Sequence, residues 1–291
     1  MDLKMNTKTG LVLEGGGTRG MYTAGVLDVM MENDISFDGI IGVSAGALFG
    51  VNFLSKQPGR AIRYNKIFNK NPKYMGIKSL ITEGNLVSTK FAYGEVPRNL
   101  DPFDNETFKK SDVPFYAVVT NVDTGEPEYI QIKDVFEQMD SLRASGSMPI
   151  VSKCVEIDGK RYLDGGISDS IPTEWFAKQG FNKQVVILTR DSSYVKKPFP
   201  KAAASLLKKY PKVADRMLSR HLMYNNELAI LRQYEREGTA FIICPSKPIT
   251  ISKTEKDETK LQEVYDLGRE DCQRLIDEIR GFLVEIAVRL C

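Results

Sequence analysis

A serine flanked by small residues is the side chain in this sequence best suited to chemistry. Ser44 lies in the run Gly42-Val43-Ser44-Ala45-Gly46, which matches the Gly-x-Ser-x-Gly pattern of a nucleophile elbow. In such an elbow a strand turns sharply into a helix, so the neighbours must be small and the hydroxyl is left exposed. A strand-like run precedes the pattern and a helix-like run follows it. We therefore predict that Ser44 is a nucleophile rather than part of a chance match.

A serine hydroxyl needs a base to accept its proton, and in a triad that base is histidine. The chain of 291 residues contains one histidine, His221, which excludes a metal site built on several histidines. His221 lies in a basic and apolar stretch with helical character and no loop signals. We favour a structural role for it and keep the catalytic base as the alternative. If His221 is not the base, a carboxylate must accept the proton.

Asp164 is the carboxylate with the strongest local signal. It ends a β-like run in Tyr162-Leu163-Asp164-Gly165-Gly166, where the two glycines allow a neighbouring loop to approach closely. The alternative is a simple Asp-Gly-Gly turn.

A glycine-rich loop follows the first predicted strand. It consists of Gly15, Gly16, Gly17, Thr18, Arg19 and Gly20. Dinucleotide binding would require an acidic residue at the end of the second strand, whereas here Asp38 precedes that strand. The alternative is a loop whose backbone N–H groups, at a helix N-terminus, point toward a developing negative charge. Arg19 would add a positive charge or brace the loop.

Together these motifs resemble the signature set of the patatin-like phospholipases. The set comprises residues 15–20, 42–46 and 164–166, and the block Ala144-Ser145-Gly146-Ser147-Met148-Pro149 also resembles the family. The resemblance covers about residues 9–190, and residues 200–291 look like the helical tail of bacterial members. It implies an α/β fold with a central, mostly parallel sheet sandwiched by helices, related to the α/β-hydrolases.

The resemblance also implies a mechanism, a Ser–Asp dyad without histidine. Ser44 would attack a fatty acyl ester of a phospholipid or lysophospholipid, Asp164 would accept the proton, and water would hydrolyse the acyl-enzyme. The oxyanion and substrate-binding positions would be residues 15–20 and Ala45. No cofactor and no metal is implied. Two alternatives stay open: an acyltransferase that uses the same dyad, and a lipid-binding or regulatory protein without turnover.

The predicted elements that position these residues alternate between strand and helix, which favours a parallel sheet covered by helices. Residues 56–112 are irregular and would form a cap or insertion. We expect a single domain over residues 1–291. The strands are predicted at 11–13, 40–43, 113–121, 128–132, 155–157, 161–163, 184–189 and 241–244, and the helices at 19–32, about 48–54, 134–144, 202–237 and 255–290, the last with interruptions at Gly268 and Gly281.

Composition excludes some partners and leaves others open. The net charge of +2 gives no general attraction to nucleic acid. The four cysteines are scattered, which favours reduced thiols and a cytoplasmic protein. No run approaches the roughly 18 apolar residues of a membrane span. The basic stretch 201–220 is either a solvated helix face or an amphipathic helix that contacts a membrane surface transiently. The sequence does not indicate an oligomeric state.

Overall fold

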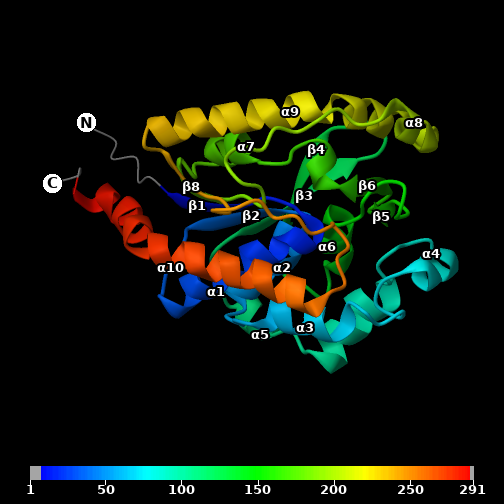
Figure 1. Ribbon diagram of the computed structural model, residues 1–291, viewed down its shortest axis with the longest axis horizontal. Coiled ribbons are helices and arrows are strands. Elements are labelled where there is room, and N and C mark those ends of the chain that lie inside the picture. The colour runs from blue at the N-terminus through cyan, green and yellow to red at the C-terminus, as the bar shows by residue number, and fades with distance from the viewer. Residues whose placement is uncertain (1–7, 289–291) are drawn as a thin grey trace.

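A mixed eight-stranded sheet forms the centre of the computed structural model, which describes residues 8–288, with side chains through Val284 (Figure 1). The strand order is β5-β6-β3-β2-β1-β7-β8, and β4 pairs with β3 outside this path. The central strands are parallel, whereas the β3–β4, β3–β6 and β5–β6 pairs are antiparallel. The strands are β1 Thr9–Leu13, β2 Gly39–Val43, β3 Phe115–Asn121, β4 Pro127–Ile132, β5 Val155–Ile157, β6 Lys160–Asp164, β7 Lys183–Ile187 and β8 Ala240–Ile243.

Helices cover both faces of the sheet, as the α/β prediction requires (Figure 1). Along β1, Leu11 and Leu13 belong to the core on the side of α1 and α10, while Val12 packs on the side of α7 and α9. This alternation follows from the two-residue period of a strand, and both faces are apolar because both are covered. The helices are α1 Met21–Glu32, α2 Ala45–Leu54, α3 Arg60–Phe68, α4 Ile77–Glu83, α5 Asn105–Lys109, α6 Met139–Ser145, α7 Thr173–Lys178, α8 Lys201–Ala204, α9 Pro211–Arg236 and α10 Glu258–Val288, with the short helical turns η1 Gly17–Gly20, η3 Gly165–Ile167 and η4 Ser205–Leu207 and the π-helix η2 Phe91–Leu100.

The ends of two strands converge at adjacent positions along β3. β2 runs parallel to β3 and ends at Val43, which lies opposite Val118. β6 runs antiparallel to β3 and ends at Asp164, which lies opposite Val119. The residue after Val43 and the last residue of β6 are thereby brought together, although they are 120 positions apart in the sequence.

Three predicted segments outside the basic stretch 201–220 differ from the structure. Residues 56–112 are mostly helical rather than irregular, since α3, α4, η2 and α5 lie there. The helix predicted at 134–144 begins only at Met139. The C-terminal segment forms one continuous helix through Gly268 and Gly281, so the alternative of a helix pair is wrong; residues 289 and 290 of that prediction lie outside the described part.

Close packing explains why α10 keeps a glycine in its interior. A Cβ atom on Gly268 would overlap the carbonyl oxygen of Tyr22 on α1, and one on Gly25 of α1 would overlap the carbonyl oxygen of Tyr265 on α10. Gly268 is therefore a contact position between two helices rather than a helix terminator. Tyr22 also donates a hydrogen bond of 3.1 Å to Asp271, which fixes the register of the pair.

The basic stretch 201–220 does not belong to one continuous helix, as the helix predicted at 202–237 would require. It is divided into α8, η4 and the start of α9, because the chain turns at residues 208–210 and Pro211 begins a new helix. Arg216 bonds the carbonyl oxygen of Gly125, and Arg220 faces the sheet rather than solvent. The stretch therefore does not present one continuous basic face.

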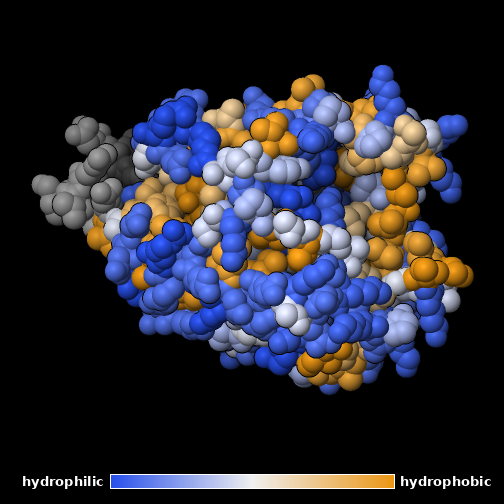
Figure 2. Space-filling model, in the orientation of Figure 1, coloured by the Kyte–Doolittle hydropathy of each residue, from blue (hydrophilic) through white to orange (hydrophobic). Residues whose placement is uncertain are grey.

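No helix among the described residues is long and apolar enough to cross a bilayer. Apolar side chains do gather on the surface at the end of the molecule where α4 and α8 lie (Figure 2). Ile77 and Ile81 on α4 are 75% and 77% exposed, and Leu206 on η4 is 68% exposed.

Candidate active site

Ser44 occupies the sharp turn between β2 and α2. Its backbone φ is +54° and its ψ is −121°, a strained conformation for a residue with a side chain. The backbone N–H of Ser44 donates a 2.9 Å hydrogen bond to the Oγ of Ser145 at the end of α6, which holds the turn in place. The structure thus gives Ser44 the geometry expected of a nucleophile elbow, directly before the N-terminus of a helix.

Asp164 lies within hydrogen-bond distance of the Ser44 hydroxyl. The Ser44 Oγ donates to Asp164 Oδ2 at 2.7 Å, and the N–H of Gly166 donates to Asp164 Oδ1 at 2.8 Å. Each carboxylate oxygen therefore has a partner, and the hydrogen bond from Gly166 orients the group toward Ser44. Burial raises the pKa of Asp164 above its ordinary value, while the Ser44 hydroxyl and Arg220 oppose that shift. A raised pKa makes this carboxylate a better proton acceptor than an exposed aspartate.

The glycine-rich loop passes beside Ser44. Gly17 has φ of +58°, and a Cβ atom there would overlap the carbonyl oxygen of Lys253. The N–H of Thr18 donates to that same carbonyl oxygen at 3.0 Å, so it is not free to bind an oxyanion. Among the described residues, the N–H groups of Gly15, Gly16, Gly17 and Ala45 donate to no protein acceptor. These four groups are therefore the candidate oxyanion donors within the predicted set.

The other predicted loop residues have packing roles. Gly15 lies against the Cβ atom of Ser44, and Gly20 lies against Phe49 and Ala45. Arg19 is only 6% exposed, and its Nε atom is buried without a hydrogen-bond partner. Burial and the nearby Arg190 lower the pKa of Arg19 to about 10.

The remaining motif glycines allow the elbow and the Asp164 turn to pack closely. A Cβ atom on Gly46 would overlap the carbonyl oxygen of Leu13, and one on Gly42 would overlap the backbone of Ala47. Gly165 lies against the carbonyl oxygen of Val118, as the sequence pattern predicted for a close approach after Asp164.

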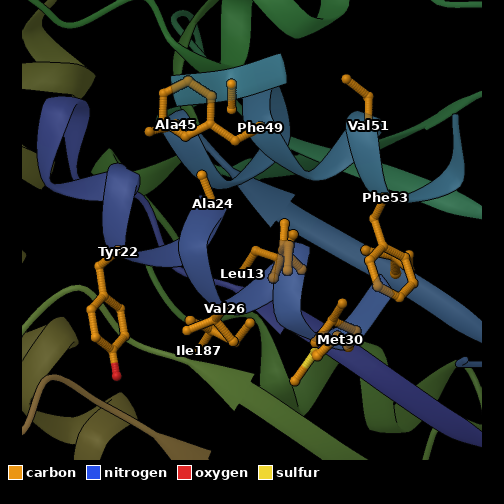
Figure 3. Packing of buried hydrophobic residues seen from close by; sticks show 14 of the residues in the cluster. Leu13, Tyr22, Ala24, Val26, Met30, Ala45, Phe49, Val51, Phe53 and Ile187 are labelled. Carbon is orange, nitrogen blue, oxygen red and sulfur yellow. The ribbon is translucent and has the colours of Figure 1, made fainter. Parts of the chain in front are cut away.

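An apolar cavity extends from one side of Ser44. Figure 3 shows Ala45, Phe49 and Val51 on α2, and all three contribute to its lining. The other walls come from the region between α3 and η2 and from α6. They include Tyr64, Tyr74, Met75, Val87, Tyr93, Val96, Met139 and Leu142, together with Phe103 after η2 and Leu48 on α2.

A second cavity, which we call the basic pocket, also includes Ser44 and Asp164 in its lining. Its five cationic side chains are Arg19, Arg190, Lys196, Arg220 and Lys253. Four of them come from the part of the chain beyond β7, in which the sequence motifs predict no site residue. Arg220 was noticed in the sequence only as part of a basic stretch, and the others carry no local motif.

His221 lies within α9, as predicted, and lines neither of these two cavities. Its Nδ1 atom is buried and has no hydrogen-bond partner among the described residues. The arrangement around Ser44 therefore contains a carboxylate and no imidazole.

Two residues that the sequence analysis did not assign support the site. Ser145 lies in the block that resembled the family, but nothing in that block indicated a bond to the Ser44 backbone. Glu14, directly before the glycines, accepts hydrogen bonds from the N–H of Thr189 at 2.6 Å and from the hydroxyl of Tyr224 at 2.7 Å. Glu14 thereby ties the end of β1 to β7 and α9.

Two family models and several known proteins match this chain. The model of the patatin-like phospholipase family matches residues 11–176, and the model of a domain of unknown function, DUF6363, matches residues 210–284. The uncharacterized protein YjjU of Escherichia coli (strain K12) is 30% identical over 267 residues, which are 89% of this chain and 74% of that protein. The neuropathy target esterase sws of Drosophila grimshawi is 28% identical over 171 residues, which are 56% of this chain and 11% of that protein.

A solved structure, VipD from Legionella pneumophila, aligns with 94% of this chain and 67% of its own chain at a TM-score of 0.46 and 14% identity. This chain spans only about a tenth of the length of the Drosophila esterase. The family match covers more than half of the chain, and it contains both the Ser44 elbow and Asp164. The chain belongs to the patatin-like phospholipase family, which supports a lipid acyl hydrolase activity in general.

Proposed function

We propose that the protein hydrolyses fatty acyl esters of phospholipids or lysophospholipids through a Ser44–Asp164 dyad and an acyl-enzyme intermediate. The observation that carries this proposal is the 2.7 Å hydrogen bond from Ser44 Oγ to Asp164 Oδ2. A base within this distance can accept the hydroxyl proton as the oxygen attacks a carbonyl carbon.

The surrounding groups support both halves of such a reaction. In acylation, Asp164 takes the Ser44 proton and passes it to the leaving alcohol, while N–H groups from the four candidate donors stabilise the oxyanion. In deacylation, Asp164 takes a proton from water as the water oxygen attacks the ester carbonyl, and it then gives this proton to the leaving Ser44 Oγ, which releases the fatty acid. Removal of one oxyanion donor from a site of this kind costs about 3 to 4 kcal/mol of transition-state stabilisation.

The apolar cavity supports a fatty acyl chain as the acyl group. Its walls carry aromatic and aliphatic side chains such as Phe49, Tyr74 and Leu142, and Ser44 lies in the same lining. Burial of an alkyl chain there is favourable by about 0.8 kcal/mol for each methylene group. An acyl chain in this cavity would bring its carboxyl carbon to Ser44.

The decisive experiment compares the wild type with Ser44→Ala on p-nitrophenyl butyrate and on a lysophospholipid. We expect kcat/KM to fall by about 10³-fold or more, because the nucleophile is lost. A fluorophosphonate should label the wild type at Ser44 and fail to label the variant. Ser55→Ala is the matched control, since Ser55 lies at the other end of α2 and outside both cavities. Equal activity of Ser44→Ala and wild type, with both folded by circular dichroism, contradicts the proposal.

We also propose that the end of the molecule that carries α4 and η4 contacts a lipid surface transiently. Its exposed side chains include Ile77, Ile81 and Leu206 (Figure 2). Residues that follow α4 and α6 also line the cavities, so lipid could enter from this end. Ile77→Ser/Ile81→Ser should lower hydrolysis of vesicle lipid relative to p-nitrophenyl butyrate. An unchanged ratio contradicts this contact.

We further propose that the chain forms one domain. The supporting observations are that β8, from the C-terminal part, pairs with β7, and that α10 packs along α1. A single cooperative unfolding transition followed by two independent signals is the expected result.

A further inference from the structure

The basic pocket holds five cationic side chains that form no salt bridge among the residues with described side chains. Arg190 lies 4.5 Å from the ring of Tyr194, and Lys196 lies 4.0 Å from the ring of Tyr224. Arg220 donates to the carbonyl oxygen of Gly166 and to the Ser170 hydroxyl. The direct partners of these three cations are therefore rings and neutral oxygens, while Glu14 and Asp164 attract the cations of the pocket without forming an ion pair with them.

The carboxylates near the pocket have their oxygens bonded to neutral donors. Glu14 accepts from Thr189 and Tyr224, and Asp164 accepts from Ser44 and Gly166. A third acid, Glu227, lies near Arg220, but burial and the nearby Asp169 raise its pKa well above its ordinary value. The pocket lining itself thus has three more cationic than anionic side chains.

Such a cluster is costly to maintain without an anion. Burial and the nearby Arg220 lower the pKa of Lys196 to about 7 and that of Lys253 to about 8. The buried Arg19 Nε atom has no partner. A negatively charged ligand in the pocket would pair with the lysines and accept hydrogen bonds from the arginine side chains that line it.

The position of the pocket indicates which part of the substrate brings the negative charge. Ser44 lies in the lining of both cavities, so an ester bound there has its acyl side in one and its alcohol side in the other. The apolar cavity suits the acyl chain, which leaves the alcohol portion to the basic pocket. Arginine and lysine together are the usual protein ligands of phosphate.

We propose that the basic pocket binds a phosphate group on the alcohol portion of the substrate, and that the enzyme prefers acyl glycerol phosphates to uncharged acyl glycerols. This inference rests on the proposed function and adds the headgroup class to it. A terminal phosphate monoester matches the excess of positive charge best. A phosphocholine headgroup would bring a further cation toward the pocket, and a bare glycerol would leave the five cations unpaired.

The first test compares three substrates with the same acyl chain in mixed detergent micelles: 1-oleoyl glycerol 3-phosphate, its phosphocholine analogue and 1-oleoyl glycerol. We expect kcat/KM for the phosphate monoester to exceed that for the uncharged glycerol by about tenfold or more, the size of one charged hydrogen bond. The phosphocholine substrate should lie between them. Equal values for all three, or a preference for the uncharged ester, would overturn the proposal.

The second test asks whether the pocket itself causes the preference. Lys196→Met should lower the ratio of phosphate monoester to uncharged ester by about tenfold. The matched control is Lys197→Met, which removes the same charge from an exposed neighbour outside the pocket lining and should leave the ratio unchanged. If Lys196→Met does not fold, Lys196→Gln and Lys253→Met test the same prediction. An unchanged ratio in folded pocket variants contradicts the inference.

A binding measurement separates this inference from the proposed catalysis. sn-Glycerol 3-phosphate should raise the Tm of the wild type, and the increase should be smaller in Lys196→Met than in Lys197→Met. If no ester is hydrolysed but this shift is present, the proposed function fails while the phosphate site stands. If inorganic phosphate gives the same shift and the lipids show no preference, the pocket binds a free anion and headgroup recognition is wrong.

Discussion

Residues 11–176 and residues 188–284 both reach Ser44, but they contribute different kinds of group. The first part supplies the candidate nucleophile and the candidate base, which short hydrogen bonds hold in place, and it supplies the glycine loop. The second part supplies four of the five cations of the basic pocket. We call these parts the motif segment and the C-terminal segment.

This difference indicates that the motif segment carries the covalent chemistry and the C-terminal segment carries the recognition of a charged group. A covalent step requires a few atoms at fixed distances, and the strand ends at β2 and β6 provide such distances. Recognition of a charged group requires a local potential, which side chains from several distant elements can build together. We therefore expect substitutions in the motif segment to abolish turnover and substitutions in the C-terminal segment to change selectivity or stability.

Asp164→Asn in the motif segment should have the largest effect of the substitutions considered below. The amide cannot accept the Ser44 proton, so we expect kcat/KM for p-nitrophenyl butyrate to fall by about 10² to 10⁴-fold. The measurement is steady-state hydrolysis with folding checked by circular dichroism. Asp158→Asn, an exposed position in the turn before β6, is the matched control and should retain activity. Comparable activity of the two variants would show that the base lies elsewhere.

The pH dependence should report the same carboxylate. Because burial raises the pKa of Asp164, its base form is lost at a higher pH than that of an ordinary aspartate near 3.9. We expect kcat/KM for p-nitrophenyl butyrate, an uncharged ester, to rise with pH on the acidic side of the profile. The midpoint of this acidic limb should lie above the ordinary aspartate pKa of about 3.9. The profile should be measured from about pH 4 to pH 8, and His221→Ala should keep the limb. A limb near pH 6.5 that disappears in His221→Ala would instead indicate an imidazole base.

A smaller effect should follow from removing the hydrogen bond between Tyr224 and Glu14, which links the C-terminal segment to the motif segment. Tyr224 on α9 donates to the buried Glu14, so Tyr224→Phe leaves a carboxylate oxygen without that partner. We expect a loss of about 1 to 3 kcal/mol in the free energy of unfolding, measured by urea denaturation. Tyr234→Phe on the same helix is the control, because its hydroxyl has no hydrogen bond among the described residues. Equal stability of the two variants would mean that α9 and β1 are not coupled through Glu14.

Much of the motif segment could be predicted from the sequence because its signals are local. The Ser44 elbow and the turn after Asp164 depend on residues a few positions apart. Strands β1, β2 and β3 are continuous apolar runs, as expected for strands covered on both faces. The pairing of Asp164 with Ser44 followed from the single histidine and from the family resemblance, since no local pattern encodes a contact across 120 positions.

The C-terminal segment was harder to predict, for a physical reason. Arg220 and Lys253 look like surface charges in the sequence, because long basic side chains are mostly exposed. Their convergence on one pocket depends on how α9 and the residues before α10 pack against the sheet. The break at residues 208–210 was also missed, although Pro211 at the first position of α9 is a known start signal.

The smallest effect should come from His221, and it is informative because the chain has no other histidine. His221 lies on α9, lines neither cavity, and has a buried Nδ1 atom without a partner among the described residues. His221→Ala should therefore change kcat/KM by no more than about twofold, as for a substitution away from any site. The same steady-state measurement as for Asp164→Asn checks this. A loss of a hundredfold or more would restore a histidine-based triad and place a catalytic group in the C-terminal segment. That result would contradict the proposed separation of roles, which requires that α9 contribute positive charge to the basic pocket but no catalytic base.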